Sequence, residues 1–339
     1  MRAFLIALLA AGCCEFSGPR WRGHPTDHFD GEQFHNQVPG EPRFSDLISW
    51  RTSRLPGRWP AFVDLPPAPR PPYRVGAGEL RVTFVNHATV LIQMDGVNIL
   101  TDPIWGEIAG PVPYIARERH RPPGLRFEDL PPVDLVLISH DHYDHMDIPT
   151  LQRLQAAHHP RIVAGLGQAA LLRSFGVEHV TELDWWQWTP AAGLRVWGVP
   201  ARHNCRRGGC DGNARLWLGF VLRSAAGDVY FAGDTGYGPH FQEIADRFGA
   251  PRLALLPIAP GLPRALFAPV HMDARDAVIA ARTLRARTSI PIHFGTFRQG
   301  DEADGEAEAK LRAQQPLRGW VILHNGESWP TSSPAAGGS

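Results

Sequence analysis

The chain has 339 residues, of which 43% are hydrophobic, so it is long enough to bury a substantial core. Its 34 basic and 34 acidic side chains give a formal net charge of zero, and this balance gives no electrostatic reason to expect a nucleic-acid partner. The 32 prolines are spread among apolar segments, which indicates structured loops rather than disorder.

The first twelve residues have the pattern of an export signal. Arg2 precedes an apolar run at 3–11, and Gly12 and Cys13 follow it. The run is too short to span a bilayer, but it resembles a bacterial lipoprotein signal, in which the cysteine is lipidated after cleavage. We therefore expect a signal peptide at 1–12 and a lipidated Cys13 that anchors the protein in the cell envelope, facing the periplasm. The alternative is a spurious start or an ordinary apolar N-terminus on a cytoplasmic protein.

Residues 13–77 are predicted to form an extended, proline-rich arm, because no helical or strand periodicity is sustained there. The polar cluster at 27–31 has mixed spacing and no strand beside it, so packing is a better interpretation than a metal site. Residues 78–330 are predicted to form one folded domain, followed by a flexible tail at 331–339.

The predicted domain opens with three short β segments at 80–85, 89–94 and 97–101, separated by turns. His87 and Asp102 lie at turns that end two of these segments. We interpret them as residues that orient metal ligands through hydrogen bonds, and structural turn residues are the alternative.

The most informative stretch is Ser-His-Asp-His-Tyr-Asp-His at 139–145, between an apolar strand at 133–138 and a helix that begins near Asp147. Such a loop holds exposed side chains on a rigid scaffold. Three imidazoles and a carboxylate within six residues do not suit a core, and a solvated polar loop explains them poorly.

The spacing within this stretch predicts a metal centre. In an extended loop His140 and His142 point the same way and can hold one ion, while Asp144 and His145 begin a second site. Neutral imidazole nitrogen and carboxylate oxygen are ligands suited to zinc, iron or manganese.

The His-x-His-x-Asp-His pattern resembles the signature of the metallo-β-lactamase superfamily of binuclear hydrolases. The resemblance implies a lone His, then an Asp, then a final His downstream, each just past a strand. The sequence supplies His203, Asp234 and His293 in that order and context. The implied fold is an α/β protein of the αββα sandwich type, with two mixed β-sheets packed face to face and helices outside.

Further stretches resemble the N-acyl-phosphatidylethanolamine-hydrolysing phospholipase D family over roughly residues 78–328. They are Asn-His-Ala-Thr at 86–89, Thr-Asp-Pro-Ile at 101–104, Glu-Leu-Asp-Trp-Trp at 182–186, Phe-Ala-Gly-Asp-Thr-Gly-Tyr at 231–237 and Ile-His-Phe-Gly-Thr-Phe at 292–297. This resemblance implies two Zn²⁺ per chain, with Fe or Mn as possible substitutes. One zinc would be held by His140, His142 and His203, the other by Asp144, His145 and His293, with Asp234 bridging them.

A pair of such ions would share a hydroxide of lowered pKa and clamp phosphate oxygens during in-line displacement. Asp144 and Asp234 are thus catalytic candidates, and His271 matches a family histidine that would bind phosphate or protonate the leaving group. A helix-terminus histidine that only packs is the alternative for His271. Trp186 and Arg264 are candidate substrate contacts, and packing is an equal alternative for Trp186.

The predicted activity is a zinc-dependent phosphodiesterase of the phospholipase D type, acting on a phospholipid or another small phosphodiester or ester. One alternative is a lactonase, β-lactamase or other esterase on the same metals. Redox use with a flavin is disfavoured, because such relatives place a carboxylate where His142 stands. An envelope scaffold without turnover is the alternative from another class, and a homodimer is compatible with the sequence.

Cys205 and Cys210 flank the loop that follows His203. In an exported protein they could form a disulfide that stiffens this loop, and two independent thiols are the alternative.

Overall fold

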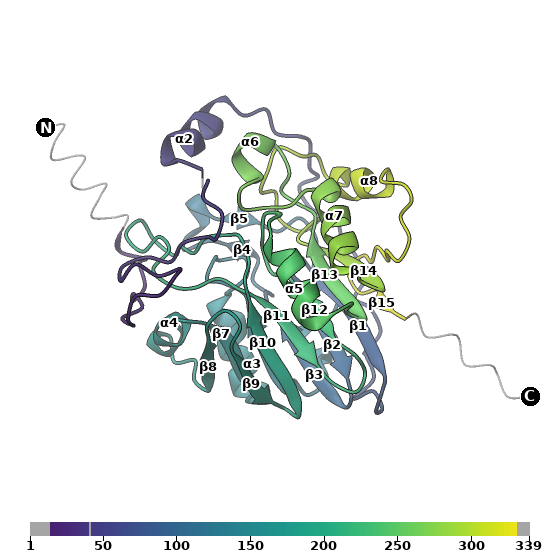
Figure 1. Ribbon diagram of the computed structural model, residues 1–339. Coiled ribbons are helices and arrows are strands. Elements are labelled where there is room, and N and C mark those ends of the chain that lie inside the picture. The colour runs from purple at the N-terminus through teal and green to yellow at the C-terminus, as the bar shows by residue number, and fades with distance from the viewer. Residues whose placement is uncertain (1–13, 41, 331–339) are drawn as a thin grey trace, which may run out of the picture.

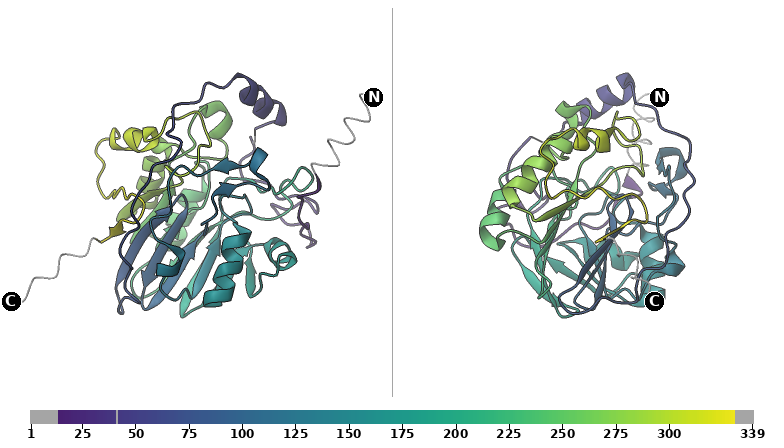
Figure 2. Two further views of the ribbon diagram at one scale, coloured as in Figure 1. Left: turned by 180° about the vertical axis from the view of Figure 1, so that it is seen from behind. Right: turned by 90° about the vertical axis from the view of Figure 1, so that its right-hand side faces the viewer.

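Two β-sheets packed face to face form the centre of the protein in the computed structural model, which describes residues 14–40 and 42–330. Figures 1 and 2 show helices on the outer side of both sheets. This arrangement confirms the predicted αββα fold. The predicted signal peptide at 1–12, the anchor at Cys13 and the tail at 331–339 lie outside the described residues.

The first sheet has seven strands in the order β15-β1-β2-β3-β6-β7-β8. Their bounds are β1 Leu80–Asn86, β2 Thr89–Met94, β3 Val97–Thr101, β6 Leu135–Ile138, β7 Arg161–Gly165, β8 Val180–Leu183 and β15 Ser328–Trp329. Strands β3, β6, β7 and β8 run parallel, so the loops after them leave from the same end of the sheet.

The second sheet has six strands in the order β14-β13-β12-β11-β10-β9. Their bounds are β9 Trp188–Ala191, β10 Leu194–Val199, β11 Gly219–Arg223, β12 Val229–Phe231, β13 Leu253–Pro257 and β14 Thr288–Ile292. The β12, β13 and β14 strands are parallel, and the β9 to β12 strands pair antiparallel. Both sheets are therefore mixed.

The helices and short elements surround the sheets. Their bounds are α2 Phe44–Ser53, α3 Ile148–His158, α4 Gln168–Ser174, α5 His240–Phe248, α6 Arg264–Phe267, α7 Ala274–Leu284, α8 Glu306–Arg312, the 3₁₀ turns Pro113–Ile115 and Phe127–Asp129, and the two-stranded ribbon β4 Ile108–Ala109 and β5 Arg117–Glu118. Asp273 caps α7 by accepting a hydrogen bond from the backbone of Asp276 at 2.9 Å. None of the helices in the described ranges is long and apolar enough to cross a bilayer.

The β6 strand shows why its sequence is apolar at every position. Side chains alternate along a strand, so Leu135 and Leu137 point into the core between the sheets. Val136 and Ile138 point to the other face, into a second core that includes Leu151 of α3. Both faces of the strand are buried, and this burial explains a continuous apolar run in place of an alternating one.

The described part of the arm lies along the domain surface (Figure 2) and contains the helix α2. Local periodicity did not predict α2, because its main contacts are distant in sequence. Trp50 of α2 packs edge-on against Phe267 at 5.4 Å between ring centroids and donates a hydrogen bond to Asp301 at 2.7 Å. Trp59, farther along the arm, donates to the backbone carbonyl of Glu302 at 2.8 Å.

The cysteines pair differently from the bridge considered for Cys205 and Cys210, so that possibility is wrong. Cys210 forms a disulfide with Cys14, with the two Cα atoms 5.0 Å apart. Cys205 is a free thiol that is buried in the core between the sheets. Cys205 faces the core, whereas Cys210 lies on the exposed part of the loop after His203. The disulfide of Cys210 therefore ties this loop to the start of the arm.

Candidate metal centre

The predicted ligands meet at one end of the two sheets, on loops that follow strands. Four of them lie on the loop after β6 of the first sheet, namely His140, His142, Asp144 and His145. The second sheet supplies the rest from the loops after β10, β12 and β14, namely His203, Asp234 and His293. The site therefore lies between the two sheets at their common loop end, where residues from distant parts of the chain converge.

Three imidazoles form the first group of ligand atoms. Nε2 of His140 lies 2.8 Å from Nδ1 of His142, and Nε2 of His203 lies 3.2 Å from the same Nδ1 atom. Burial lowers the pKa of His140 well below its ordinary value and lowers the pKa of His203 to about 3. Such imidazoles are neutral at neutral pH, and the neutral form is the one that binds a metal ion.

The second group combines histidines and carboxylates. Nε2 of His145 lies 3.1 Å from Nε2 of His293 and 3.3 Å from Oδ2 of Asp144. Burial opposes charge on His293, but the carboxylates of Asp234 and Asp144 outweigh it and raise the pKa of His293 to about 9. This group therefore attracts positive charge.

Asp234 lies between the two groups. Its Oδ2 atom is 3.0 Å from Nε2 of His293, 3.2 Å from Nε2 of His145 and 3.7 Å from Nε2 of His203. Its Oδ1 atom is buried and has no hydrogen-bond partner in the described chain. Burying an unpaired carboxylate oxygen costs free energy, and a bound cation would offset this cost.

This donor set fits two metal ions. The nitrogen and oxygen atoms of each group lie within 4.8 Å of one another, and most of their side chains are buried. Imidazole nitrogens that face each other at hydrogen-bonding distance have at most one proton to share, whereas a cation between them satisfies all of them. His140, His142 and His203 would hold one ion, Asp144, His145 and His293 the other, and Asp234 lies where it can reach both.

Four of the five histidine ligands, all but His142, are oriented by their far ring nitrogens, each of which has an acceptor. Nδ1 of His145 lies 2.7 Å from Asp102, and Nδ1 of His140 lies 2.9 Å from the hydroxyl of Ser139. Nδ1 of His203 faces the carbonyl of Val270 at 2.8 Å, and Nδ1 of His293 faces that of Ala259 at 2.7 Å. These contacts fix the tautomer that presents Nε2 to the metal. The structure thus gives Asp102 the orienting position expected of it.

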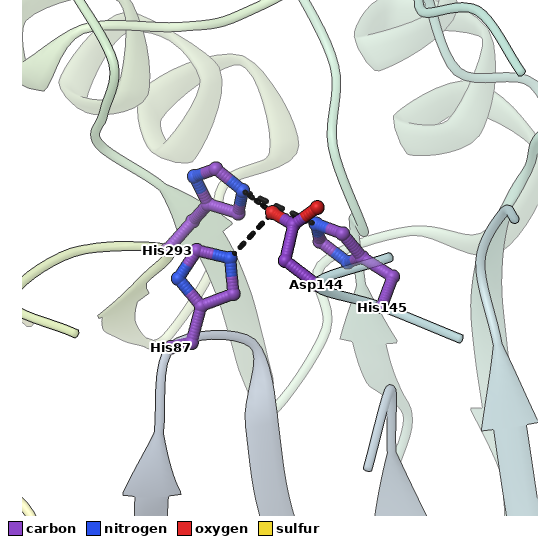
Figure 3. Close-up of side chains that lie close together, drawn as sticks. All are labelled: His87, Asp144, His145 and His293. Carbon is purple, nitrogen blue, oxygen red and sulfur yellow. Dashed lines mark hydrogen bonds and ion pairs between the residues drawn. The ribbon is translucent and has the colours of Figure 1, made fainter. Parts of the chain in front are cut away.

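His87 has an orienting position as well. Figure 3 shows its ring beside Asp144, and Nε2 of His87 lies 2.9 Å from Oδ2 of that carboxylate. The side-chain amide of Gln299 donates to the same oxygen at 2.5 Å. Sequence reasoning missed Gln299 because nothing in its local pattern distinguishes it. Only the turn after β14 brings it to the site.

Backbone strain marks the same site. His87, Asp102 and His293 have left-handed backbone conformations, with φ of 47°, 35° and 62°. This conformation is unfavourable for residues other than glycine and costs of order 1–3 kcal/mol each, so it persists where the surroundings enforce it. Three of the ten described non-glycine residues with positive φ thus hold or orient ligands, and strain of this kind is tolerated at functional sites.

A buried ion network supports the ligand loop from below. The guanidinium of Arg215 pairs with Asp141, within the motif, and with Asp211, each at 2.5 Å. All three side chains are almost completely buried. Arg215 also donates to the carbonyl of Pro19, so one side chain joins the ligand loop, the loop after His203 and the arm.

A cleft of about 540 Å³ opens above the ligands. Polar residues of the centre lie at its floor, and apolar side chains form part of its wall, including Leu47 of α2, Ile115, Leu266, Phe267 and Val270. A hollow of this size and mixed lining suits a small molecule with a polar reacting group and an apolar tail.

His271 faces this cleft. Its Nδ1 atom lies 3.6 Å from Oδ2 of Asp234 and has no hydrogen-bond partner in the described chain. Burial holds the pKa of His271 well below its ordinary value, although the charge of Asp234 opposes this. The structure thus brings His271 to the centre, near enough that it could also contribute a nitrogen to a group with His203 and Asp234.

The other two predicted substrate contacts do not line the cleft, and these predictions are corrected. Trp186 lines a separate hollow with Trp188 and Trp197, beside the edge of the second sheet. Its backbone N–H donates to the carbonyl of Gly198 of β10, and the guanidinium of Arg247 lies over its ring at 4.5 Å from the ring centroid. Arg264 instead pairs with Asp276 and donates to the backbone carbonyl of His271, so it supports the loop that carries this histidine.

Comparison with known proteins gives a consistent picture. Residues 97–294 match the family model described as the Beta-lactamase superfamily domain. The chain is 33% identical over 272 residues to an N-acyl-phosphatidylethanolamine-hydrolyzing phospholipase D of Caenorhabditis elegans, covering 75% of this chain and 76% of that protein. It is 38% identical over 250 residues to an uncharacterized protein of Mycobacterium tuberculosis, covering 72% of this chain and 66% of that protein.

Two further similarities concern metal-dependent hydrolases. A metal-dependent hydrolase of Methanopyrus kandleri is 28% identical over 74% of this chain and 99% of its own. The solved structure of a metallo hydrolase from Ignicoccus hospitalis is 25% identical and superimposes with a TM-score of 0.56 over 74% of this chain and 97% of its own. An isothiocyanate hydrolase from Delia radicum gut bacteria, with 21% identity and a TM-score of 0.58, shares the fold.

Proposed function

The chain belongs to the metallo-β-lactamase superfamily and, within it, to the family of the N-acyl-phosphatidylethanolamine-hydrolysing phospholipase D relatives, and from this premise we propose that it is a phosphodiesterase that cleaves N-acyl-phosphatidylethanolamine-like lipids. Membership of a metal-dependent hydrolase family makes the coarser statement firm: the protein is a metal-dependent hydrolase. The proposal adds zinc as the metal, a phosphodiester as the bond that is cleaved and a lipid as the substrate.

The observation that carries the proposal is the position of the apolar wall relative to the ligand atoms. Ile115, Leu266 and Phe267 line the same cleft as His142, Asp144 and Asp234. A phosphodiester placed on the ligands would therefore have apolar surface beside it for acyl chains. A lactone or β-lactam of small size needs no such wall, so the cleft favours a lipid.

The chain contributes orientation, charge and a proton carrier. Bound metal ions would supply Lewis acidity and a water molecule of lowered pKa. Asp102, the hydroxyl of Ser139 and the carbonyls of Ala259 and Val270 hold the histidines in one tautomer, so the site needs little reorganisation. His271 has a ring nitrogen directed at the centre and can hydrogen-bond a phosphate oxygen or pass a proton to the leaving group.

The proposal is tested on purified, metal-loaded protein. N-acyl-phosphatidylethanolamine in detergent micelles should yield an N-acylethanolamine and phosphatidic acid, identified by mass spectrometry. A parallel panel of a chromogenic phosphodiester, a lactone and nitrocefin compares bond types at equal enzyme concentration. Turnover of the lactone or nitrocefin without turnover of either phosphodiester would contradict the proposal and favour the esterase alternative.

We further propose that Cys13 is lipidated and that the protein acts at the envelope membrane, where such a substrate is found. Support comes from the sequence of the first thirteen residues. The Cys13→Ser variant is then expected to move from the detergent phase to the aqueous phase in a partitioning experiment. Equal partitioning of the two forms would reject the anchor and leave the hydrolase proposal intact.

A further inference from the structure

A second hollow, of about 380 Å³, adjoins the cleft and has a different character. Its lining combines Arg51 and Arg54 from the end of α2, Arg117 and Glu118 from β5, and His120 and Arg298 from later segments. We call it the arginine pocket. Its basic side chains come from three separate parts of the chain, so neither a local charge run nor one helix face produced them.

Most of this positive charge has no partner within the protein. Arg54 is neutralised by Asp301, with Nε and Oδ1 2.9 Å apart, and Glu118 is the one acidic residue of the lining. Arg51, Arg117 and Arg298 form no ion pair and no side-chain hydrogen bond with any described residue. Like charges gathered in a concave surface repel one another and focus a positive potential into it, which an anion relieves.

Arg117 links the two hollows. Arg117 and Ile115 line both the arginine pocket and the cleft above the ligands. Arg117 is exposed to solvent, and its guanidinium interacts electrostatically with the carboxylate of Asp144 and with the charges of Arg51 and Arg54. The guanidinium is thus within electrostatic reach of a metal ligand on one side and of two arginines on the other.

The pocket is also fixed in position relative to the centre. Arg119, two residues after Arg117, forms a β-bridge with Phe297, and its guanidinium donates to the carbonyls of Gly106 and Ile104. Arg298 directly precedes Gln299, whose amide reaches Asp144. The arginines of the pocket and the ligands of the centre are therefore held on shared, mutually bonded segments.

From this juxtaposition we infer that the arginine pocket binds a second anionic group, a phosphate monoester or carboxylate, of the same molecule whose phosphodiester lies on the metal ligands. The planar guanidinium fork matches the oxygens of both groups and binds them through paired, charge-assisted hydrogen bonds. The inference rests on the proposed diesterase function and refines its substrate class. N-acyl-phosphatidylethanolamine itself has no second anionic group, so a related phosphodiester with an additional anionic group on the chain that extends past Arg117 is preferred over it.

A pair of matched substrates tests this inference. One is a p-nitrophenyl phosphodiester with a short alkyl chain, and the other has the same chain ending in a phosphate monoester. The wild-type holoenzyme is expected to have a kcat/KM about tenfold or more higher for the second substrate, since charge-assisted phosphate contacts are of that strength. Arg51→Gln, Arg117→Gln and Arg298→Gln, combined, should abolish the preference, which is the ratio of the two kcat/KM values. Because Arg117 also lines the cleft, this ratio is the measure, and the rate on the first substrate alone is not.

Arg312→Gln is the matched control, because this exposed arginine of α8 lies outside both hollows. It should keep the full preference. No preference in the wild type, or an undiminished preference in the triple variant, would overturn the inference. If p-nitrophenol is released from neither substrate, the proposed diesterase function has failed, and the pocket is tested separately. Hexyl phosphate is then titrated by calorimetry into wild-type and triple-variant holoenzyme of equal metal content. Anion binding in the pocket is supported only if the variant loses binding.

An anionic membrane is the other source of phosphate for these arginines, because the side chains of Tyr114 and Ile115 beside the pocket are exposed. Sedimentation with vesicles of phosphatidylglycerol and phosphatidylcholine distinguishes that source of phosphate. If the triple variant loses vesicle binding but keeps the preference between the soluble substrates, the arginines contact a membrane surface and the substrate inference is wrong.

Discussion

The metal-ligand loops and the segments that wall the cleft differ in how they are held. The ligands lie on loops of the two sheets, nearly all are buried, and second partners fix their ring orientations. The wall formed by α2 and the β4–β5 ribbon has exposed apolar side chains and unpaired arginines. The comparison teaches that the candidate metal ligands lie on buried loops of the core, whereas the residues proposed for recognition lie on exposed segments.

The largest effect is expected where the two groups of ligands join. Asp234→Ala removes the carboxylate that lies within 3.7 Å of four histidines, so both metal ions should bind more weakly and activity should fall about 10³-fold or more. Metal analysis of the dialysed protein and a diesterase assay measure this. Asp228→Ala, in the neighbouring hairpin, is the control and should keep both metals. Full activity of Asp234→Ala would refute the two-metal centre.

The next largest effect concerns the buried ion network that supports the ligand loop. Arg215→Met leaves Asp141 and Asp211 buried without their cation, which should lower the free energy of unfolding by about 3–5 kcal/mol. Urea denaturation measures the loss. Arg223→Met breaks a partly exposed pair with Asp228 and should cost less than about 1 kcal/mol. Equal losses for the two variants would mean that the buried network does not hold the ligand loop.

His271 tests whether catalysis depends on residues beyond the ligands. His271→Asn should lower kcat about 10²-fold, the usual scale for loss of a general acid, because its ring nitrogen is directed at the centre. The melting temperature and metal content are measured alongside and should stay at wild-type values. If metal is lost as well, His271 is a ligand; if stability falls but kcat is normal, it only packs.

The smallest effect is expected in the arm. His28 stacks on Trp185 at 4.3 Å and lies 2.8 Å from Asp184; burial lowers its pKa, but Asp184 and Asp27 outweigh burial and raise it above 6.5. A raised pKa means that this stabilisation is complete below about pH 6.5 and is lost as pH rises through the folded-state value. The stability difference between wild type and His28→Gln should therefore be about 1 kcal/mol at pH 6 and shrink toward pH 9.

Chemical denaturation at several pH values gives that difference directly. His35→Gln removes an exposed pair with Asp30 and is the control, with little expected change at any pH. A difference for His28→Gln that grows as pH rises would have the wrong sign and would exclude the proposed ion pair.

Local patterns in the sequence were enough for the sheets and the ligands. The β6 strand and the polar loop after it are recognisable from consecutive residues, and the αββα fold follows from the resemblance that the loop carries. His203, Asp234 and His293 were predicted from the ligand order that the same resemblance implies, each just past a strand. The arm and domain boundaries at 77 and 330 remain predictions. Trp186 and Arg264, predicted as substrate contacts, do not line the cleft, and the Cys205–Cys210 bridge, which was left open beside two free thiols, is excluded by the disulfide between Cys14 and Cys210.

By itself, therefore, the sequence determined the fold, the chemical type of the centre and the identity of the candidate ligands, because a motif of few residues fixes each of these. Only the tertiary structure decided which residues support the centre and which form its surroundings. Gln299 reaches Asp144, Cys14 bonds Cys210, and Arg51, Arg117 and Arg298 share one pocket through contacts between residues far apart in the chain. Such contacts depend on the packing of whole elements, which no local periodicity encodes.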